Sequence, residues 1–360
     1  MTSRPIRAAA LAALLIFSGG VAAQQRPLKK VTIAAGTQVL NIAYPWLMMP
    51  QALNYWRDEG LDVQVIVGQS SLQSIQLMAA GNADFAQVNS GPLVQAAVTH
   101  GIPIKAVMVN GVVDWSLVVP EGSAIRNVAD FKGKAIGVST LGTGGVPLLR
   151  SYLRANGLAE GDVQIVPVGF GPVALQAMRG DKVQGLMYWA SAIASFENVG
   201  EKMRYFVASD WRRYPDFSLA TLQSTIQKDP AMVEAIVRGA AKASVFTAAN
   251  PDCVRQLQWK HFPASKPSGA DEATLAARDL NYLNAQLDSM KKAMQLGGGV
   301  WGKTAGDQFA PFEDFLLGMK IIERKLASPN LYVIDLPGFF EKANGFDKAP
   351  IEAAAKKCAI

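Results

Sequence analysis

Residues 139–145, with the sequence STLGTGG, are the part of this chain best suited to hold a ligand through its backbone. They lie between an apolar run typical of a strand and a pattern typical of a helix. Small residues at such a turn leave backbone N–H groups exposed, and the helix dipole adds positive charge. Thr140, Thr143 and Gly144 are therefore candidates for binding an anionic group. The turn lacks the Gly-Lys-Ser/Thr of a nucleotide P-loop and the G-x-G-x-x-G of dinucleotide sites.

Polar and aromatic residues also follow other predicted strands, and open parallel sheets bind ligands beyond the carboxyl ends of their strands. These further candidates are Gln38, Tyr44, Trp46, Ser70, Ser71, Asn89, Ser90, Tyr188 and Trp189. The aromatic rings could stack on a planar ligand or pack into the core. The serines could bind an anion at a helix N-terminus or simply cap that helix. The sequence leaves both interpretations open.

Residue types that usually carry catalysis are sparse. His100 and His261 have no partner at metal-ligand spacing, and the chain has no Gly-x-Ser-x-Gly motif. We therefore expect neither an enzyme nor a bound metal or other cofactor. Cys253 and Cys358 are a disulfide candidate if the protein is exported, the alternative being two unpaired thiols.

Strand and helix patterns alternate along most of the chain. Predicted strands are residues 30–35, 61–67, 84–88, 104–109, 115–119, 135–139, 163–168, 184–189 and 203–207. Strands separated by helices of this length form βαβ units, so we predict an α/β fold with mainly parallel sheets and flanking helices. From about residue 225 the pattern is mostly helical, with helices at 231–249, 271–295 and 311–327. We expect this part to return over the first βα units.

The composition is that of a globular protein. It has 50% hydrophobic and 18% charged residues over 360 positions, a length that suggests two lobes. The formal net charge is +6, but basic residues are scattered among acidic ones, whereas nucleic-acid binders gather them in a patch. We therefore expect no nucleic-acid partner.

The N-terminus has the pattern of a secretory signal peptide. Arg4 and Arg7 precede the short apolar run 8–17, and small residues lead to Ala23 and then Gln24. The alternative, a membrane anchor, would need about 20 apolar residues. We expect cleavage after Ala23 and a free, soluble mature chain in the periplasm.

Four segments carry a family resemblance. They are residues 55–63 (YWRDEGLDV), 77–85 (LMAAGNADF), 130–138 (DFKGKAIGV) and 174–185 (ALQAMRGDKVQG). In this order and spacing the chain resembles the type II periplasmic binding proteins of the NMT1/THI5-like group, which includes aliphatic-sulfonate and taurine binding proteins. It departs from the family pattern where Gln184-Gly185 replaces the more usual Asp-Ala.

The resemblance implies two α/β lobes joined by two crossovers, with the ligand in the cleft between them. The crossovers would lie near residues 112–116 and 209–221. The domains expected are a signal peptide at 1–23, a discontinuous lobe 1 at 29–113 plus 219–360, and lobe 2 at 114–218. Asp114, at the first crossover, could bind a ligand amine or hold the hinge, and we favour the hinge.

The function expected is that of a periplasmic solute-binding protein, a monomer that delivers a small carboxylate or sulfonate, aromatic ones included, to an ABC permease. One alternative is a neutral pyrimidine-like or thiamine-precursor-like heterocycle as the ligand. Another is a ligand-sensing partner of a membrane receptor. An enzyme is the least favoured, because the cysteine-rich motif of the pyrimidine-synthase relatives is absent.

Overall fold

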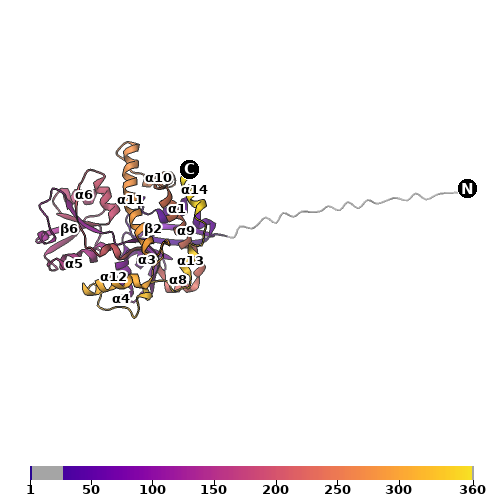
Figure 1. Cartoon of the computed structure of the whole chain (residues 1–360), viewed down its shortest axis with the longest axis horizontal. Helices are drawn as coiled ribbons and strands as arrows, with labels where there is room; N and C mark the ends of the chain where they lie inside the picture. The colour runs from indigo at the N-terminus through magenta and orange to yellow at the C-terminus, as the bar shows by residue number, and fades with distance from the viewer. Residues whose placement is uncertain (2–26, 359–360) are drawn as a thin grey trace.

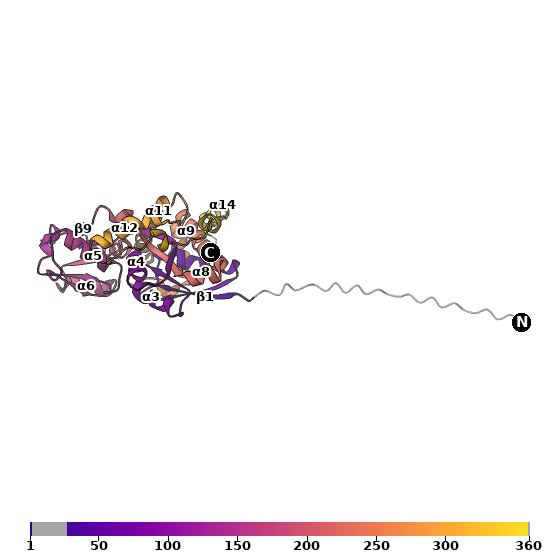
Figure 2. The ribbon, with the colours of Figure 1, turned by 90° about the horizontal axis from the view of Figure 1, so that it is seen from below.

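The computed structural model describes Met1 and residues 27–358, so the predicted signal peptide and its cleavage after Ala23 lie outside the described range. The chain forms two five-stranded sheets, one in each of two lobes. In Figure 1 the magenta elements β6, α5 and α6 of lobe 2 stand at one end, and the indigo and yellow elements of lobe 1 at the other. Figure 2 shows the same separation from below.

The two sheets have equivalent strand orders. Sheet 1, in lobe 1, runs β2 (Leu61–Val67), β1 (Lys29–Ala35), β3 (Phe85–Val88), β10 (Pro215–Leu222) and β4 (Ile104–Val112). Sheet 2, in lobe 2, runs β7 (Val163–Pro167), β6 (Lys134–Val138), β8 (Gly185–Tyr188), β5 (Ser116–Pro120) and β9 (Met203–Phe206). In each sheet the fourth strand in this order comes directly from a crossover between the lobes.

The crossover strand runs against the other four strands of its sheet. β10 is antiparallel to both β3 and β4, and β5 is antiparallel to both β8 and β9, while the remaining neighbours pair in parallel. The expectation of two lobes with mainly parallel sheets is therefore confirmed, with one reversed strand in each lobe. The predicted start of the second part of lobe 1, residue 219, falls inside β10.

Helices cover both sheets. Those before the second crossover are α1 (Pro45–Ala52), α2 (Tyr55–Asp58), α3 (Ser71–Ala79), α4 (Ser90–Thr99), α5 (Gly145–Ala155), α6 (Pro172–Arg179) and α7 (Ala190–Glu197). Those after it are α8 (Gln223–Lys228), α9 (Pro230–Ala249), α10 (Pro251–His261), α11 (Glu272–Leu296), α12 (Gly306–Gly318), α13 (Phe339–Ala343) and α14 (Ala349–Lys357). Four short 3-10 turns complete the described elements: η1 (Val128–Phe131), η2 (Trp211–Arg213), η3 (Pro263–Ser265) and η4 (Pro329–Tyr332). No helix within residues 27–358 is both long and apolar enough to cross a membrane.

The C-terminal helices differ from the sequence prediction in two respects. The helix expected at 311–327 is α12, which starts earlier, at Gly306, and also ends earlier, at Gly318. At its start, Gln308 Oε1 accepts hydrogen bonds from Thr304 Oγ1 and from the Ala305 backbone N–H. In addition, α11 does not cover lobe 1 alone. It packs on β4 of lobe 1 and on α7 of lobe 2, and the side chain of Asn198 donates to the backbone oxygen of Arg278 at 2.8 Å.

A disulfide between Cys253 and Cys358 ties α10 to the end of α14. The two cysteines are 105 residues apart in the sequence. The paired interpretation is therefore correct, and the bridge holds the C-terminal helix on lobe 1.

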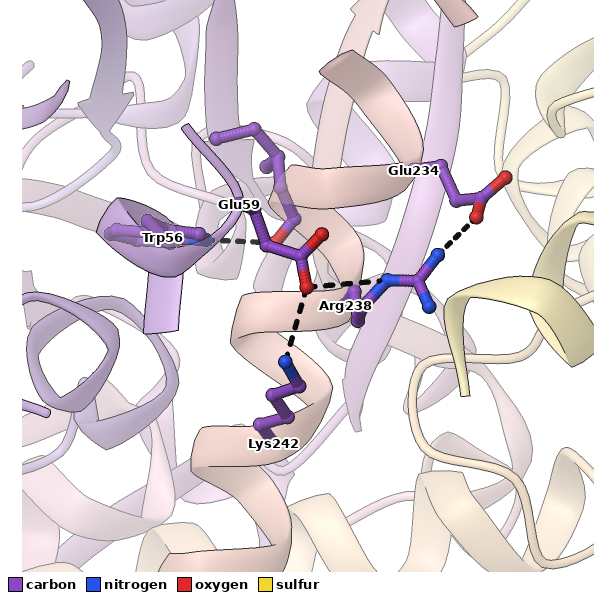
Figure 3. Close-up of polar contacts among 6 residues, drawn as sticks. Trp56, Glu59, Glu234, Arg238 and Lys242 are labelled. Carbon is purple, nitrogen blue, oxygen red and sulfur yellow. Dashed lines mark hydrogen bonds and ion pairs between the residues drawn. The ribbon is translucent and has the colours of Figure 1, made fainter. Parts of the chain in front are cut away.

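A second tie fixes the segment 55–63 to α9 (Figure 3). The Trp56 ring is buried, and its Nε1 donates to the backbone oxygen of Ile236 at 3.0 Å. Glu59 pairs with Lys242 at 3.1 Å and with Arg238 at 3.5 Å. Several residues that carry the family resemblance in this segment therefore contribute to the packing of lobe 1.

We predict that Gly239→Ala destabilises the protein, although alanine is normally the better helix residue. A Cβ at position 239 would lie 2.2 Å from Cδ1 of the Trp56 ring, which cannot move within the core. Overpacking of this kind costs about 1–3 kcal/mol. Urea unfolding should show the loss, whereas Gly318→Ala, in open space, should be neutral. Equal stability of the Gly239→Ala variant and the unchanged chain would contradict this packing.

Candidate functional site

A cavity lies between the lobes at the carboxyl ends of the parallel strands. Its walls come from the loops after β1, β2 and β3 of lobe 1, the loops after β6, β7 and β8 of lobe 2, and both crossovers. The lining residues are Gly36, Thr37, Gln38, Tyr44, Gln69, Gln87, Asn89, Trp115, Ser139, Thr143, Phe170, Trp189 and Phe217. The position is the one expected for ligands of open parallel sheets.

The cavity is aromatic and carries no formal charge on its walls. Phe170 and Trp189 are stacked, with ring centroids 5.5 Å apart and planes 6° apart, and Trp115 meets Trp189 edge-on at 5.3 Å. Tyr44 and Phe217 complete the aromatic set. Among the described residues no Asp, Glu, Lys, Arg or His lines the cavity. The remaining polar walls are amides and hydroxyls, which can both donate and accept hydrogen bonds.

The free volume is small, about 20 Å³. That is roughly enough for one water molecule. The lobes therefore stand close together in this conformation, and a planar ring can enter only if they separate or if the aromatic side chains turn.

Two non-glycine residues of the lining have left-handed backbone conformations. Gln69 has φ = 56° and Phe217, inside β10, has φ = 51°. A bulky residue in this region is uncommon, and such strain is concentrated at functional sites. Asp216 lies opposite Gly111 and Ser218 opposite Val109, in one register, but Phe217 between them has no paired partner on β4. The Phe217 ring belongs to the cavity lining.

Directly behind the lining, Asp216 is buried and fully hydrogen-bonded. Its carboxylate accepts the Ser90 backbone N–H at 2.8 Å, Asn89 Nδ2 at 2.9 Å and Trp115 Nε1 at 3.2 Å. Burial raises the pKa of Asp216 to about 6, although these hydrogen bonds oppose the rise. Asp216 thus fixes two side chains that line the cavity.

Asp114 is the second buried carboxylate, 4% exposed, and lies on the first crossover. Neither oxygen accepts a hydrogen bond of good geometry from the described part of the chain, although the backbone N–H of Ala190 is close enough to lower the pKa. Burial dominates and raises the pKa of Asp114 to about 7, against the opposing effect of Arg212. The Arg212 guanidinium itself donates to the backbone oxygens of Val113 and Trp115, at 2.7 and 3.1 Å.

The glycines of the turn 139–145 allow close contact between the lobes. A Cβ on Gly144 would lie 2.5 Å from the Asn89 Cβ of lobe 1, and, within lobe 2, a Cβ on Gly145 would lie 2.3 Å from the Trp115 ring. Thr143 lines the cavity, whereas Thr140 does not, although its hydroxyl is buried without a partner among the described residues. The turn therefore serves lobe contact as well as any contact with a ligand.

The remaining candidates divide between the cavity and the scaffold. The cavity lining includes Gln38, Tyr44, Asn89, Thr143 and Trp189. The scaffold holds Trp46 and Tyr188 in the core, Ser70 as the cap of α3, Ser71 hydrogen-bonded to Asn89, and Ser90 hydrogen-bonded to Ser218 and Asp216. The N–H group that α4 was expected to offer to an anion, that of Ser90, is thus already taken by Asp216.

Sequence reasoning did not select Gln87, Phe170, Phe217 or Asp216. Gln87 gave a usable signal, because it is a polar residue inside an otherwise apolar, buried strand. The other three follow turns or a crossover, and no local pattern indicates which way their side chains point.

We predict that Asp114 lowers the stability of the protein as the pH rises. Between about pH 4 and pH 7 the folded state binds a proton that the unfolded state has released, so the free energy of unfolding falls across this range. Asp114→Asn removes this contribution. In urea unfolding it should match the unchanged chain at pH 4 and be the more stable at pH 8, by up to about 4 kcal/mol, since one pKa unit is worth about 1.4 kcal/mol.

Asp210, an exposed residue at the start of the second crossover, provides the control. Asp210→Asn should leave the pH profile unchanged. If Asp114→Asn and the unchanged chain have the same dependence of stability on pH, the folded state does not disfavour the charged form of Asp114, and the prediction is wrong.

Three known proteins are similar over most of the chain. The riboflavin-binding protein RibY of Chloroflexus aurantiacus is 25% identical over 285 residues, 78% of this chain and 80% of RibY. A protein of Bordetella bronchiseptica RB50 has a TM-score of 0.68 at 19% identity, covering 91% of this chain and 99% of its own. The periplasmic aliphatic sulphonate binding protein SsuA of Escherichia coli has a TM-score of 0.58 at 16% identity, covering 82% and 94%.

The fold is also found in an enzyme. The desulfurization enzyme DszB has a TM-score of 0.54 at 14% identity, covering 88% of this chain and 99% of its own. At these identities the solved structures share the fold with this chain, and the fold alone does not decide between binding and catalysis.

The family itself follows from the sequence match. Residues 44–253, more than half of the chain, match the family model described as NMT1/THI5 like. This range includes both crossovers and every lining residue except Gly36, Thr37 and Gln38. The chain therefore belongs to the NMT1/THI5-like family, and its two-lobed fold is that of the periplasmic binding proteins.

Proposed function

We propose that the chain is a periplasmic substrate-binding protein that captures an uncharged, planar heteroaromatic molecule and delivers it to an ABC permease. The observation that carries this proposal is the cavity wall, which has five aromatic side chains and, among the described residues, no charged one. The N-terminal pattern supports export to the periplasm.

The wall suits a flat ring in both shape and polarity. The stacked pair Phe170 and Trp189 offers an aromatic face, and such faces bind other rings by offset stacking. Gln87 Oε1 accepts the Gly36 backbone N–H at 3.2 Å, which leaves its Nε2 free to donate to a ring edge. Thr37, Gln38 and Ser139 add groups that donate or accept.

RibY supports the same ligand class. It is named for riboflavin, whose coloured part is a flat, uncharged heterocycle, and the alignment covers about four fifths of each protein. Riboflavin is therefore the first ligand to test. Of the two ligand classes that the sequence left open, the neutral heterocycle is the one that we propose.

A sulfonate or carboxylate is less well matched to this cavity. Such ligands are usually held by arginine, lysine or free helix N–H groups. The walls have no cation among the described residues, and the N–H group of Ser90 at the start of α4 already donates to Asp216. Turnover is also not part of the proposal, because the lining has no carboxylate, imidazole, amine or thiol within the described range.

We predict that the protein binds riboflavin and quenches its fluorescence as the ring stacks on Trp189. Trp189→Ala should weaken binding about tenfold or more, because stacking on one aromatic ring is worth about 1–3 kcal/mol and 1.4 kcal/mol is a factor of ten. Trp259, on α10 and outside the cavity, provides the matched control, and Trp259→Ala should bind as the unchanged chain does.

One result would contradict the proposed ligand class. If riboflavin and its bare ring lumichrome leave the fluorescence unchanged while ethanesulfonate binds in calorimetry, the proposed ligand class is wrong. The cleft would then bind sulfonates, the ligand class for which the SsuA proteins are named.

We also predict that Gly144→Ala opposes closure of the lobes. Its Cβ would meet Asn89 across the cleft at 2.5 Å, while the backbone at Gly144, with φ = −62°, accepts alanine. Riboflavin should compact the unchanged chain in small-angle scattering. The variant should bind at least tenfold more weakly and stay expanded, with an unchanged melting temperature.

Gly142→Ala is the control for this experiment. Its Cβ would lie 3.2 Å from Ser70 Oγ, a contact that a shift of a few tenths of an ångström relieves. If Gly144→Ala closes and binds like Gly142→Ala, the two lobes do not meet at Asn89 in the bound form.

A further inference from the structure

The reversed strand of each lobe places an aspartate at an equivalent position. Ser218 of β10 pairs with Val88, the last residue of β3, and Ser116 of β5 pairs with Tyr188, the last residue of β8. Asp216 and Asp114 each precede their serine by two residues. Because the strands are antiparallel, both aspartates lie beyond the carboxyl ends of the parallel strands, where the next helix begins.

In lobe 1, Asp216 occupies the N-terminal end of α4. It accepts the first helical N–H, that of Ser90, at 2.8 Å, and Asn89 Nδ2 at 2.9 Å. Asn89 is the N-cap of α4 and lines the cavity. The positive end of this helix, which faces the ligand site, is therefore occupied by a carboxylate of the protein itself.

In lobe 2, Asp114 has the equivalent place at α7. Ala190, the first residue of α7, is close enough for its backbone N–H to lower the pKa of Asp114, although it makes no hydrogen bond of good geometry to the carboxylate, and Trp189, the N-cap, lines the cavity. Asp114 and Asp216 are 4% and 1% exposed. The cation acting on Asp114 is Arg212, which has no ion pair with a carboxylate among the described residues.

We propose that Asp114 and Asp216 determine the specificity of the cleft: they occupy the positive ends of α4 and α7 as built-in anions, so that the cleft accepts uncharged rings and rejects sulfonates and carboxylates. This inference rests on the proposed function, in that it takes the cavity as the ligand site. A helix N-terminus attracts one anion, and a second anion placed beside it meets like charge in a poorly screened interior. Above about pH 7, where both carboxylates are ionised, they and Arg212 together leave one net negative charge behind the cavity.

The first test compares two probes of nearly the same shape, the anion benzenesulfonate and the neutral benzenesulfonamide, at pH 8, where both aspartates are ionised. Calorimetry is done on the unchanged chain, Asp114→Asn, Asp216→Asn and the double variant, with Asp210→Asn as a surface control. The double variant should bind benzenesulfonate at least tenfold more tightly than the unchanged chain. Affinity for benzenesulfonamide should change less than threefold in Asp114→Asn, because the Asp114 carboxylate holds no lining side chain in place.

An unchanged benzenesulfonate signal would overturn the inference, and this includes no detectable binding by either protein. The riboflavin experiment tests the proposed function separately. A chain that ignores riboflavin, but whose double variant gains benzenesulfonate binding, would overturn the proposed ligand and leave the role of the aspartates standing.

The second test asks directly whether the two positions are anion sites. Asp216→Ala leaves the N-terminal end of α4 without its carboxylate, so formate should raise the melting temperature of this variant by several degrees, whereas formamide should not. The unchanged chain should respond to neither. If Asp216→Ala does not fold, Asp114→Ala provides the same test in lobe 2. An equal response to formate and formamide would contradict the proposal.

Discussion

Each lobe of this protein depends on a strand that arrives from the other lobe. The strand must run against its neighbours, since it enters at the edge of the sheet where the parallel strands end. That constraint places the first residues of β5 and β10 beside the helix starts that face the cleft. The hinge, the ends of both sheets and the ligand cavity are consequently one connected piece of structure, and Asp114 and Asp216 lie at its centre.

The same piece of structure explains the chemistry of the cavity. Burying a carboxylate is costly unless hydrogen bonds or charges compensate it. Asp216 is compensated by Ser90, Asn89 and Trp115, two of which then form cavity walls in fixed orientations. The protein thus fills its own anion positions, and what remains for the ligand is an aromatic surface with neutral hydrogen-bonding groups. Such a site recognises ring shape and edge polarity more than charge.

The sequence predicted the architecture well because its signals are local. Strand and helix periods, glycine stops and the four family segments can each be recognised from neighbouring residues in the chain. The site was predicted only in part. Asn89 and Asp216 are 127 positions apart and meet only because a crossover strand inserts between β3 and β4. Likewise, Trp46 and Trp189 look alike as aromatic residues near strand ends, but only tertiary packing puts one in the core and the other in the cavity.

The most direct test of this account is the identity of the molecule that the exported protein carries. The full chain, with its N-terminal segment, would be expressed in a bacterium, recovered from the periplasm and analysed by native mass spectrometry, with fragmentation of any released ligand. The account predicts an uncharged heteroaromatic compound bound one to one. A sulfonate or carboxylate bound one to one would contradict it, because such a ligand would have to lie against the carboxylates of Asp114 and Asp216.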